Sequence, residues 1–168
     1  MNNRYESFMP SFSTRHRIPF TPDQMFDLVA DVESYPQFVP LCENLVITKR
    51  DGTPDRTVLT ARMDVGYKAI RESLTTRVML EPDKKRILVE YLDGPFRHLE
   101  NRWSFHEAPG GCDVDFYITY EFKSLMLAML MGALFDSAFR KFTRAFEERA
   151  RKIYGPSPAT GHPASVGV

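Results

Sequence analysis

The feature that most constrains the fold is a change of hydrophobic period close to residue 123. Between residues 44 and 122 apolar side chains recur at every second position, whereas from Ser124 to Tyr154 they follow the 3.6-residue period of an α-helix. Turn signals at 51–54, 81–83, 93–95 and 109–111 divide the first region into about six strands. The second region predicts one helix of about 31 residues, or roughly 46 Å. We expect this helix to lie across the sheet, because the chain offers no other element to cover it.

The strands alternate in a way that leaves only one face of the sheet apolar. Between residues 112 and 122 the even positions are apolar and most odd positions are polar. The preceding strand places Leu99, Trp103 and Phe105 on one face and charged or polar side chains on the other. One-sided alternation is typical of antiparallel strands with one face on the core and the other in water. The sequence therefore predicts an α+β domain with a curved antiparallel sheet.

Ahead of this region the sequence predicts a short strand over residues 12–18 and two short helices. Thr21, Pro22 and Gln24 supply an N-cap, a proline in the first turn and a capping-box partner. A second helical segment at 32–38 is interrupted by Pro36. The expected order is strand, two short helices, about six strands and a long helix, which gives a sheet of about six to seven strands.

Length and charge exclude several classes of protein. The 168 residues suit one domain, and 22 basic residues balance 22 acidic ones, so the charge argues against a dedicated nucleic-acid binder. The longest uncharged apolar stretch, residues 125–135, is shorter than the ~20 residues of a membrane-spanning helix. We expect a cytoplasmic protein with a flexible extension at 1–8, a ligand-binding domain at 9–154 and a disordered tail at 155–168.

Two motifs carry a resemblance to a known family. Residues 26–42, Phe-Asp-Leu-Val-Ala-Asp-Val-Glu-Ser-Tyr-Pro-Gln-Phe-Val-Pro-Leu-Cys, resemble the first signature of the coenzyme Q-binding branch of the START-like, or SRPBCC, polyketide cyclase and lipid-transport proteins. Residues 92–96, Leu-Asp-Gly-Pro-Phe, followed by Leu99, Asn101, Trp103 and Phe105, resemble its second signature. The similarity spans residues 9–154 and implies a helix-grip fold.

This resemblance also implies a function. It implies a non-catalytic carrier or chaperone of ubiquinone that supports respiration and needs no cofactor besides that ligand. The same branch includes bacterial toxins that inhibit ribosome association, so a ribosome-directed activity is the first alternative. A cyclase or aromatase activity is the second, because some START-like relatives are cyclases.

The residues themselves suit an apolar pocket between sheet and helix, since methionine and aromatic side chains adapt to flexible apolar ligands. A filled, dry core is the alternative. The expected lining consists of Met63, Leu74, Tyr91, Asn101, Trp103, Phe105, Phe116, Ile118, Tyr120, Met126, Met129, Leu130 and Leu134. A quinone accepts hydrogen bonds only, so Asn101, followed by Tyr120 and Tyr91, is the candidate donor to its head group. The alternative role for Asn101 is a structural amide.

The long helix carries two further features. Its first half is too apolar for burial on one side alone, so Leu127, Met131 and their neighbours are candidates to face a membrane, a second subunit or a lid. Residues 140–152 then hold six cations and two anions. This combination suits contact with anionic lipid, with a homodimer interface and a solvated charged face as the alternative.

Catalytic and metal chemistry find little support in the sequence. His98 and His106 lie too far apart along a strand to share a metal ion. Cys42 has no neighbouring base in sequence and is interpreted as a packed thiol. Glu72 shares the apolar parity of its strand with Ile70 and Leu74 and is the one candidate for a buried acid. We therefore expect neither catalytic residues nor metal ligands.

Overall fold

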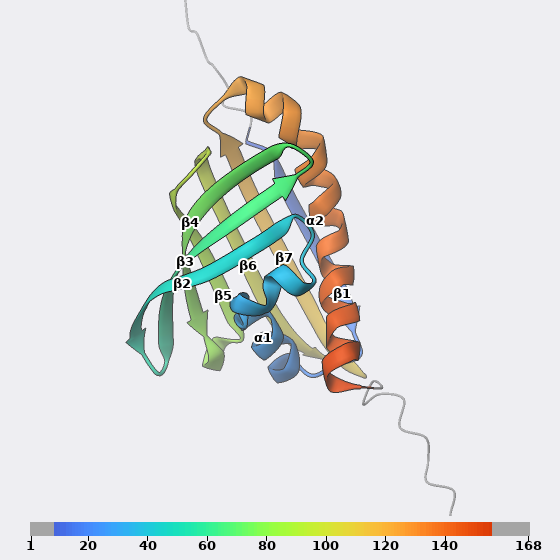
Figure 1. Cartoon of the computed structure of the whole chain (residues 1–168). Helices are drawn as coiled ribbons and strands as arrows, with labels where there is room; N and C mark the ends of the chain where they lie inside the picture. The colour runs from blue at the N-terminus through green and yellow to red at the C-terminus, as the bar shows by residue number, and fades with distance from the viewer. Residues whose placement is uncertain (1–8, 156–168) are drawn as a thin grey trace, which may run out of the picture.

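The computed structural model describes residues 9–155 and confirms the predicted α+β architecture (Figure 1). In chain order the elements are β1 (Ser11–Ile18), α1 (Pro22–Ala30), the 3-10 helix η1 (Val32–Gln37), β2 (Cys42–Thr53), β3 (Arg56–Tyr67), β4 (Ile70–Glu81), the 3-10 turn η2 (Pro82–Lys84), β5 (Arg86–Asp93), β6 (Phe96–Ala108), β7 (Gly111–Phe122) and α2 (Leu125–Tyr154). The predicted extension at 1–8, and residues 156–168 of the predicted tail, lie outside the described residues.

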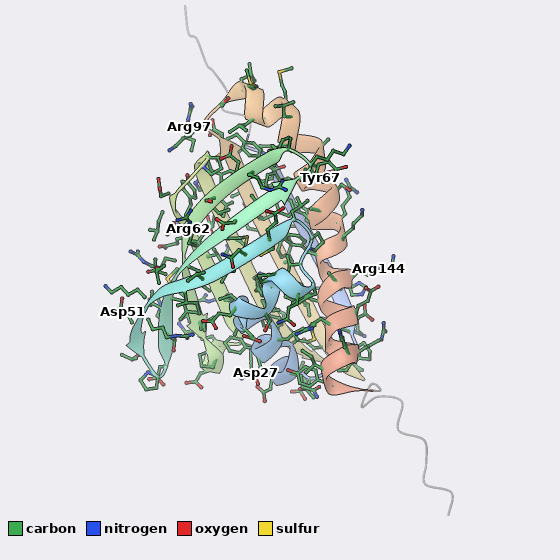
Figure 2. The ribbon with its side chains drawn as sticks, viewed as in Figure 1. Asp27, Asp51, Arg62, Tyr67, Arg97 and Arg144 are labelled. Atoms are coloured by element: carbon green, nitrogen blue, oxygen red, sulfur yellow. The ribbon has the colours of Figure 1, made fainter. Side chains whose placement is uncertain are left out.

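All seven strands belong to one antiparallel sheet in the order β1-β7-β6-β5-β4-β3-β2. The first strand pairs with the last, and the sheet curves around α2 (Figure 1). The expected alternation holds, because the even-numbered residues of β7 from Cys112 to Phe122 are buried. The convex face carries charged side chains such as Arg62 and Arg97 (Figure 2). Many of these charges are paired, for example Arg15 with Asp115 at 2.6 Å and Arg17 with Asp113 at 2.9 Å.

Helix α1 begins as the sequence predicts. The Thr21 hydroxyl accepts the Gln24 N–H at 3.1 Å, and the Gln24 side-chain oxygen accepts the Thr21 N–H at 2.9 Å. The helix packs near β5, β6 and β7, while η1 packs against β2. The sequence predicted that the long helix alone would cover the sheet. This was wrong, because both short helices also close one part of its concave face.

The long helix extends beyond what the sheet can bury. Ser124 caps its start by accepting the Leu127 N–H at 3.4 Å, and Gly155, with φ of 76°, follows its last turn. Met131, predicted to face outward, is only 1% exposed. The exposed positions are instead Leu125, Met126, Met129 and Leu130, in the first two turns at one end of the molecule (Figure 1). Within residues 9–155 no helix is long and apolar enough to cross a membrane.

The Asp-Gly-Pro-Phe motif forms the turn between β5 and β6. Gly94 has φ of 137°, and a Cβ atom there would lie 2.8 Å from the Ser73 carbonyl oxygen, so a side chain is excluded. The turn inserts Phe96 into the core, where its ring stacks on Phe122 at 4.7 Å. The Tyr91 hydroxyl accepts the Phe96 N–H at 3.1 Å. This motif therefore serves the packing of the sheet against α2.

Candidate functional site

A cavity of about 130 Å³ lies between the concave face of the sheet and α2. Its walls come from η1 and the following loop, from β2 to β7 and from the middle of α2. The lining residues are Val32, Tyr35, Val39, Pro40, Leu41, Leu45, Ala61, Met63, Val65, Leu74, Thr76, Val78, Ile87, Val89, Phe96, Leu99, Asn101, Trp103, Phe116, Ile118, Phe135, Phe139, Phe142 and Phe146. Nearly all are aliphatic or aromatic, so the wall favours an apolar guest.

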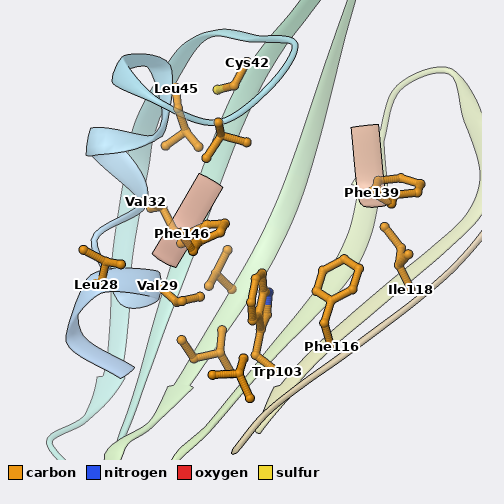
Figure 3. Close-up of a cluster of buried hydrophobic side chains, with 14 of the residues drawn as sticks. Leu28, Val29, Val32, Cys42, Leu45, Trp103, Phe116, Ile118, Phe139 and Phe146 are labelled. Carbon is orange, nitrogen blue, oxygen red and sulfur yellow. The ribbon is translucent and has the colours of Figure 1, made fainter. Parts of the chain in front are cut away.

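The structure brings together six of the residues expected to line this cavity: Met63, Leu74, Asn101, Trp103, Phe116 and Ile118. They come from β3, β4, β6 and β7, and each lies on the inward parity of its strand. Trp103 packs between Phe116, with ring centroids 4.7 Å apart, and Phe146 of α2, 5.0 Å away (Figure 3). The period-two pattern thus places these side chains correctly on the concave face.

Four other expected residues share the interior but do not line the cavity. Phe105 packs at the α1 end against Phe26, with centroids 6.0 Å apart. Tyr120 packs against Phe139 at 5.5 Å, Tyr91 holds the β5–β6 turn, and Leu134 is half-buried on α2. Strand parity identifies the buried face, but it does not show that aromatic packing fills both ends of that face and leaves only its middle hollow.

Met126, Met129 and Leu130 do not line the cavity either. Each is exposed, with Met129 at 77%, because the first turns of α2 project past the sheet. The helical period shows that this segment is apolar nearly all round, but it does not show where the helix leaves the sheet. The lining from α2 comes instead from Phe135, Phe139, Phe142 and Phe146. Their spacing of three, four and seven residues was the available signal.

Sequence reasoning also missed the contribution of η1 and the loop after it. Tyr35 contacts the Phe146 ring at 5.4 Å, and its hydroxyl donates a hydrogen bond to the Val29 carbonyl at 2.5 Å. Burial raises the pKa of Tyr35 above its ordinary value, so the phenol stays protonated at neutral pH. Tyr35 of the first motif therefore connects this wall of the cavity to α1 and α2.

Asn101 reaches the cavity wall with its amide already engaged. Its Nδ2 donates to the Tyr117 carbonyl at 2.8 Å, and its Oδ1 accepts the indole N–H of Trp103 at 3.0 Å. These bonds are those expected of a structural amide. They also occupy the indole N–H of Trp103. Asn101 and Trp103 thus direct these hydrogen bonds to protein atoms and not into the cavity.

The described residues provide little acid–base or metal chemistry at the cavity. Glu72 is half-buried and is not among the lining residues. Cys42 is buried at the start of β2, directly after the loop that follows η1. Desolvation raises its pKa to about 11, which keeps the thiol protonated at neutral pH. Across residues 9–155 there is no group of three or more His, Cys, Asp or Glu side chains that could hold a metal ion.

Comparison with known proteins places these features in a family. The Escherichia coli K12 protein named ribosome association toxin RatA is 33% identical over 150 residues, which cover 89% of this chain and 92% of that protein. The Xenopus laevis protein named coenzyme Q-binding protein COQ10 homolog B, mitochondrial, is also 33% identical over 150 residues, but these cover 86% of this chain and 59% of that protein.

A solved structure shows the same architecture. The solution structure of an 18 kDa protein from Caulobacter crescentus matches 88% of this chain and 99% of its own, with a TM-score of 0.74 and 34% sequence identity. The family model described as polyketide cyclase / dehydrase and lipid transport matches residues 18–147. The helix-grip fold, the two motifs and these similarities agree, and the chain belongs to the polyketide cyclase/dehydrase and lipid transport family, in the branch that includes the coenzyme Q-binding and ribosome association proteins.

Proposed function

We propose that this protein binds ubiquinone in the cavity between sheet and α2 and carries it without chemical change. The observation that carries the proposal is the apolar, aromatic-walled cavity in a chain 33% identical to a protein named for coenzyme Q binding. An apolar cavity gains free energy by excluding water from a hydrocarbon ligand and needs no charged partner. A carrier of this kind would serve respiration from the cytoplasmic side of the membrane.

The chemistry of the wall supports binding over catalysis. Among the described residues that line the cavity there is no carboxylate, histidine, lysine or cysteine. Tyr35 is the one titratable lining residue, and its hydroxyl is already bonded to the Val29 carbonyl. A cyclase needs groups that move protons at the substrate. The wall gives that alternative no acid or base.

The test uses Trp103 as a built-in reporter. It is the only tryptophan in the chain, lines the cavity and is 4% exposed, so a bound quinone should quench its fluorescence. Ala61→Leu replaces a methyl with an isobutyl group inside the cavity and should abolish saturable quenching. Thr60→Leu, one residue away with its side chain on the opposite face, is the matched control and should titrate like the parent. If ubiquinone quenched the Trp103 fluorescence of the unmodified protein, Ala61→Leu and Thr60→Leu equally and without saturation, the proposal would be contradicted.

Ribosome association is the second candidate function. The toxin named above matches over 92% of its length, whereas the coenzyme Q-binding relative matches over 59%. Helix α2 also carries six cations between residues 140 and 152, of which Arg140, Arg144 and Arg151 pair with carboxylates of the same helix. Under this candidate, overexpression lowers the 70S peak in sucrose gradients, and Lys141→Glu with Arg144→Glu restores it. An unchanged gradient at high expression of the parent would remove the candidate.

We assign the exposed tip of α2, made of Leu125, Met126, Met129 and Leu130, to contact with an anionic membrane. Leu125 is 79% and Met129 is 77% exposed, and Lys123 directly precedes the helix cap, whereas the cations of 140–152 lie further along α2. Apolar side chains inserted beside cations are what binding to an anionic bilayer requires. A quinone carrier would load and unload there.

Vesicle flotation tests this contact. The parent should float with vesicles containing phosphatidylglycerol and float less with neutral vesicles, and Leu125→Ser/Met129→Ser should abolish the effect. Ala133→Ser, at another exposed position of the same helix, is the control. A concentration-dependent dimer that the double variant disrupts, with no flotation of the parent, would assign the tip to a second copy of this chain instead.

A further inference from the structure

We infer that the cavity selects the isoprenoid tail of its ligand and that the quinone ring remains at the cavity mouth. This inference rests on the proposed function and specifies which part of the ligand the interior recognises. Three features of the cavity carry it: the hydrogen bonds of its wall, its volume and the position of its partly exposed lining residues.

The first feature is the small number of free donors. A ubiquinone ring carries carbonyl and methoxy oxygens, which accept hydrogen bonds and donate none. The donors of the wall are directed elsewhere: Tyr35 donates to the Val29 carbonyl, Asn101 to the Tyr117 carbonyl and Trp103 to the Asn101 side chain. Thr76 adds a single hydroxyl, and the Asn101 amide has one further N–H. A ring held inside would therefore leave some of its carbonyl and methoxy oxygens without partners, which disfavours burial. A hydrocarbon tail has no polar atom to satisfy.

The second feature is the size of the cavity. Its volume is about 130 Å³, close to the ~150 Å³ of an engineered apolar cavity that stays dry and binds benzene. A benzoquinone that carries a methyl, two methoxy groups and a tail is larger than benzene. A prenyl chain is narrow and flexible, so it can fill the same space progressively. The rings of Phe139, Phe142 and Phe146 supply the surface against which it would pack.

The third feature is the opening of the cavity. Leu41, Met63 and Phe142 line the cavity and are only half-buried, as are Tyr35, Pro40, Thr76, Val89 and Asn101, whereas Val65, Val78 and Phe116 are buried. Leu41 follows η1, Met63 lies on β3 and Phe142 on α2, and we place the mouth of the cavity between these three elements. A ring at this mouth keeps its oxygens in contact with water while the tail extends inward. The protein then tolerates different head groups on the same type of tail.

The test compares three probes on the full-length protein. They are ubiquinone with a geranyl tail, the tailless ubiquinone head group, and squalene, which is an isoprenoid hydrocarbon without any head group. Quenching of Trp103 reports the two quinones, and squalene is detected by displacement of the geranyl quinone. We expect squalene to compete and the tailless head group to bind on the order of 100-fold more weakly or worse, because it lacks the buried carbons.

The outcomes separate this inference from the proposed function. If the tailless head group binds within about threefold of the geranyl quinone and squalene does not compete, the tail inference is wrong while ubiquinone binding stands. If no probe binds, both fail. Ala61→Leu should weaken the geranyl quinone and squalene by the same factor, and Thr60→Leu should weaken neither. If Ala61→Leu weakened binding of the geranyl quinone but not of squalene, the quinone ring, and not the tail, would lie inside the cavity.

Discussion

Replacing Asn101 with leucine should destabilise the fold through Trp103. In the parent, the indole N–H of Trp103 donates to Asn101 Oδ1 at 3.0 Å, and the Trp103 side chain is 4% exposed. Leucine has the same branched shape and number of heavy atoms but no acceptor, so this N–H is left buried without a partner. Such a group costs about 1–3 kcal/mol, and the free energy of unfolding should fall by this amount. The Tyr117 carbonyl loses the Asn101 donor in the same variant.

A double-mutant cycle isolates this effect. Trp103→Phe removes the N–H itself, so Asn101→Leu should cost less in that background, with a coupling free energy of about 0.5–3 kcal/mol. Urea unfolding followed by far-ultraviolet circular dichroism is the appropriate assay, since Trp103→Phe removes the only tryptophan. If the two substitutions add within about 0.3 kcal/mol, the indole bond does not contribute and this reasoning is refuted.

Three further predictions test other parts of the structure. Gly94→Ala should lower the free energy of unfolding by about 1–3 kcal/mol, because Gly94 has φ of 137° and its Cβ would lie 2.8 Å from a carbonyl oxygen. Gly132→Ala, in open space on α2, should raise it by about 0.5–1 kcal/mol. Chemical unfolding measures both changes. The hydrogen bond and charge of Arg15 lower the pKa of Asp115, so this stabilisation is present above the unfolded-state pKa and is lost as pH falls through the folded-state value. Asp115→Asn should flatten the acid limb of stability against pH, and an unchanged limb would contradict the assignment. Cys42, with its pKa raised to about 11, should react with iodoacetamide far more slowly at pH 7 in the folded than in the unfolded protein, and equal rates would show that the thiol is accessible.

The fold was largely predictable because its signals are local. Alternation along residues 112–122, the capping box at Thr21 and the helical period after Ser124 each appear within a short stretch of sequence. Where the structure differed from the prediction, the cause was the tertiary packing of one element on another. Met131 and Met129 are the same residue type, two positions apart, yet one is buried and the other exposed, because only one lies over the sheet.

The candidate site was predictable only in part for the same reason. Parity places Met63, Trp103 and Phe116 on the concave face, but a period cannot show which segment of that face stays hollow. Tyr120 and Phe105 obey the same parity and pack in filled regions at either side. The role of Asn101 depends on two partners, Trp103 and Tyr117, the second of which is 16 residues away in sequence. Such pairings follow from strand register, which local sequence does not specify.

The most direct measurement of the central claim is native mass spectrometry of the protein purified without detergent from ubiquinone-producing cells. The account predicts a bound mass equal to the cell's ubiquinone, one per chain, present in the parent and in Thr60→Leu and absent from Ala61→Leu. A parent that carries no lipid and shows no saturable quenching of Trp103 by added ubiquinone would contradict it.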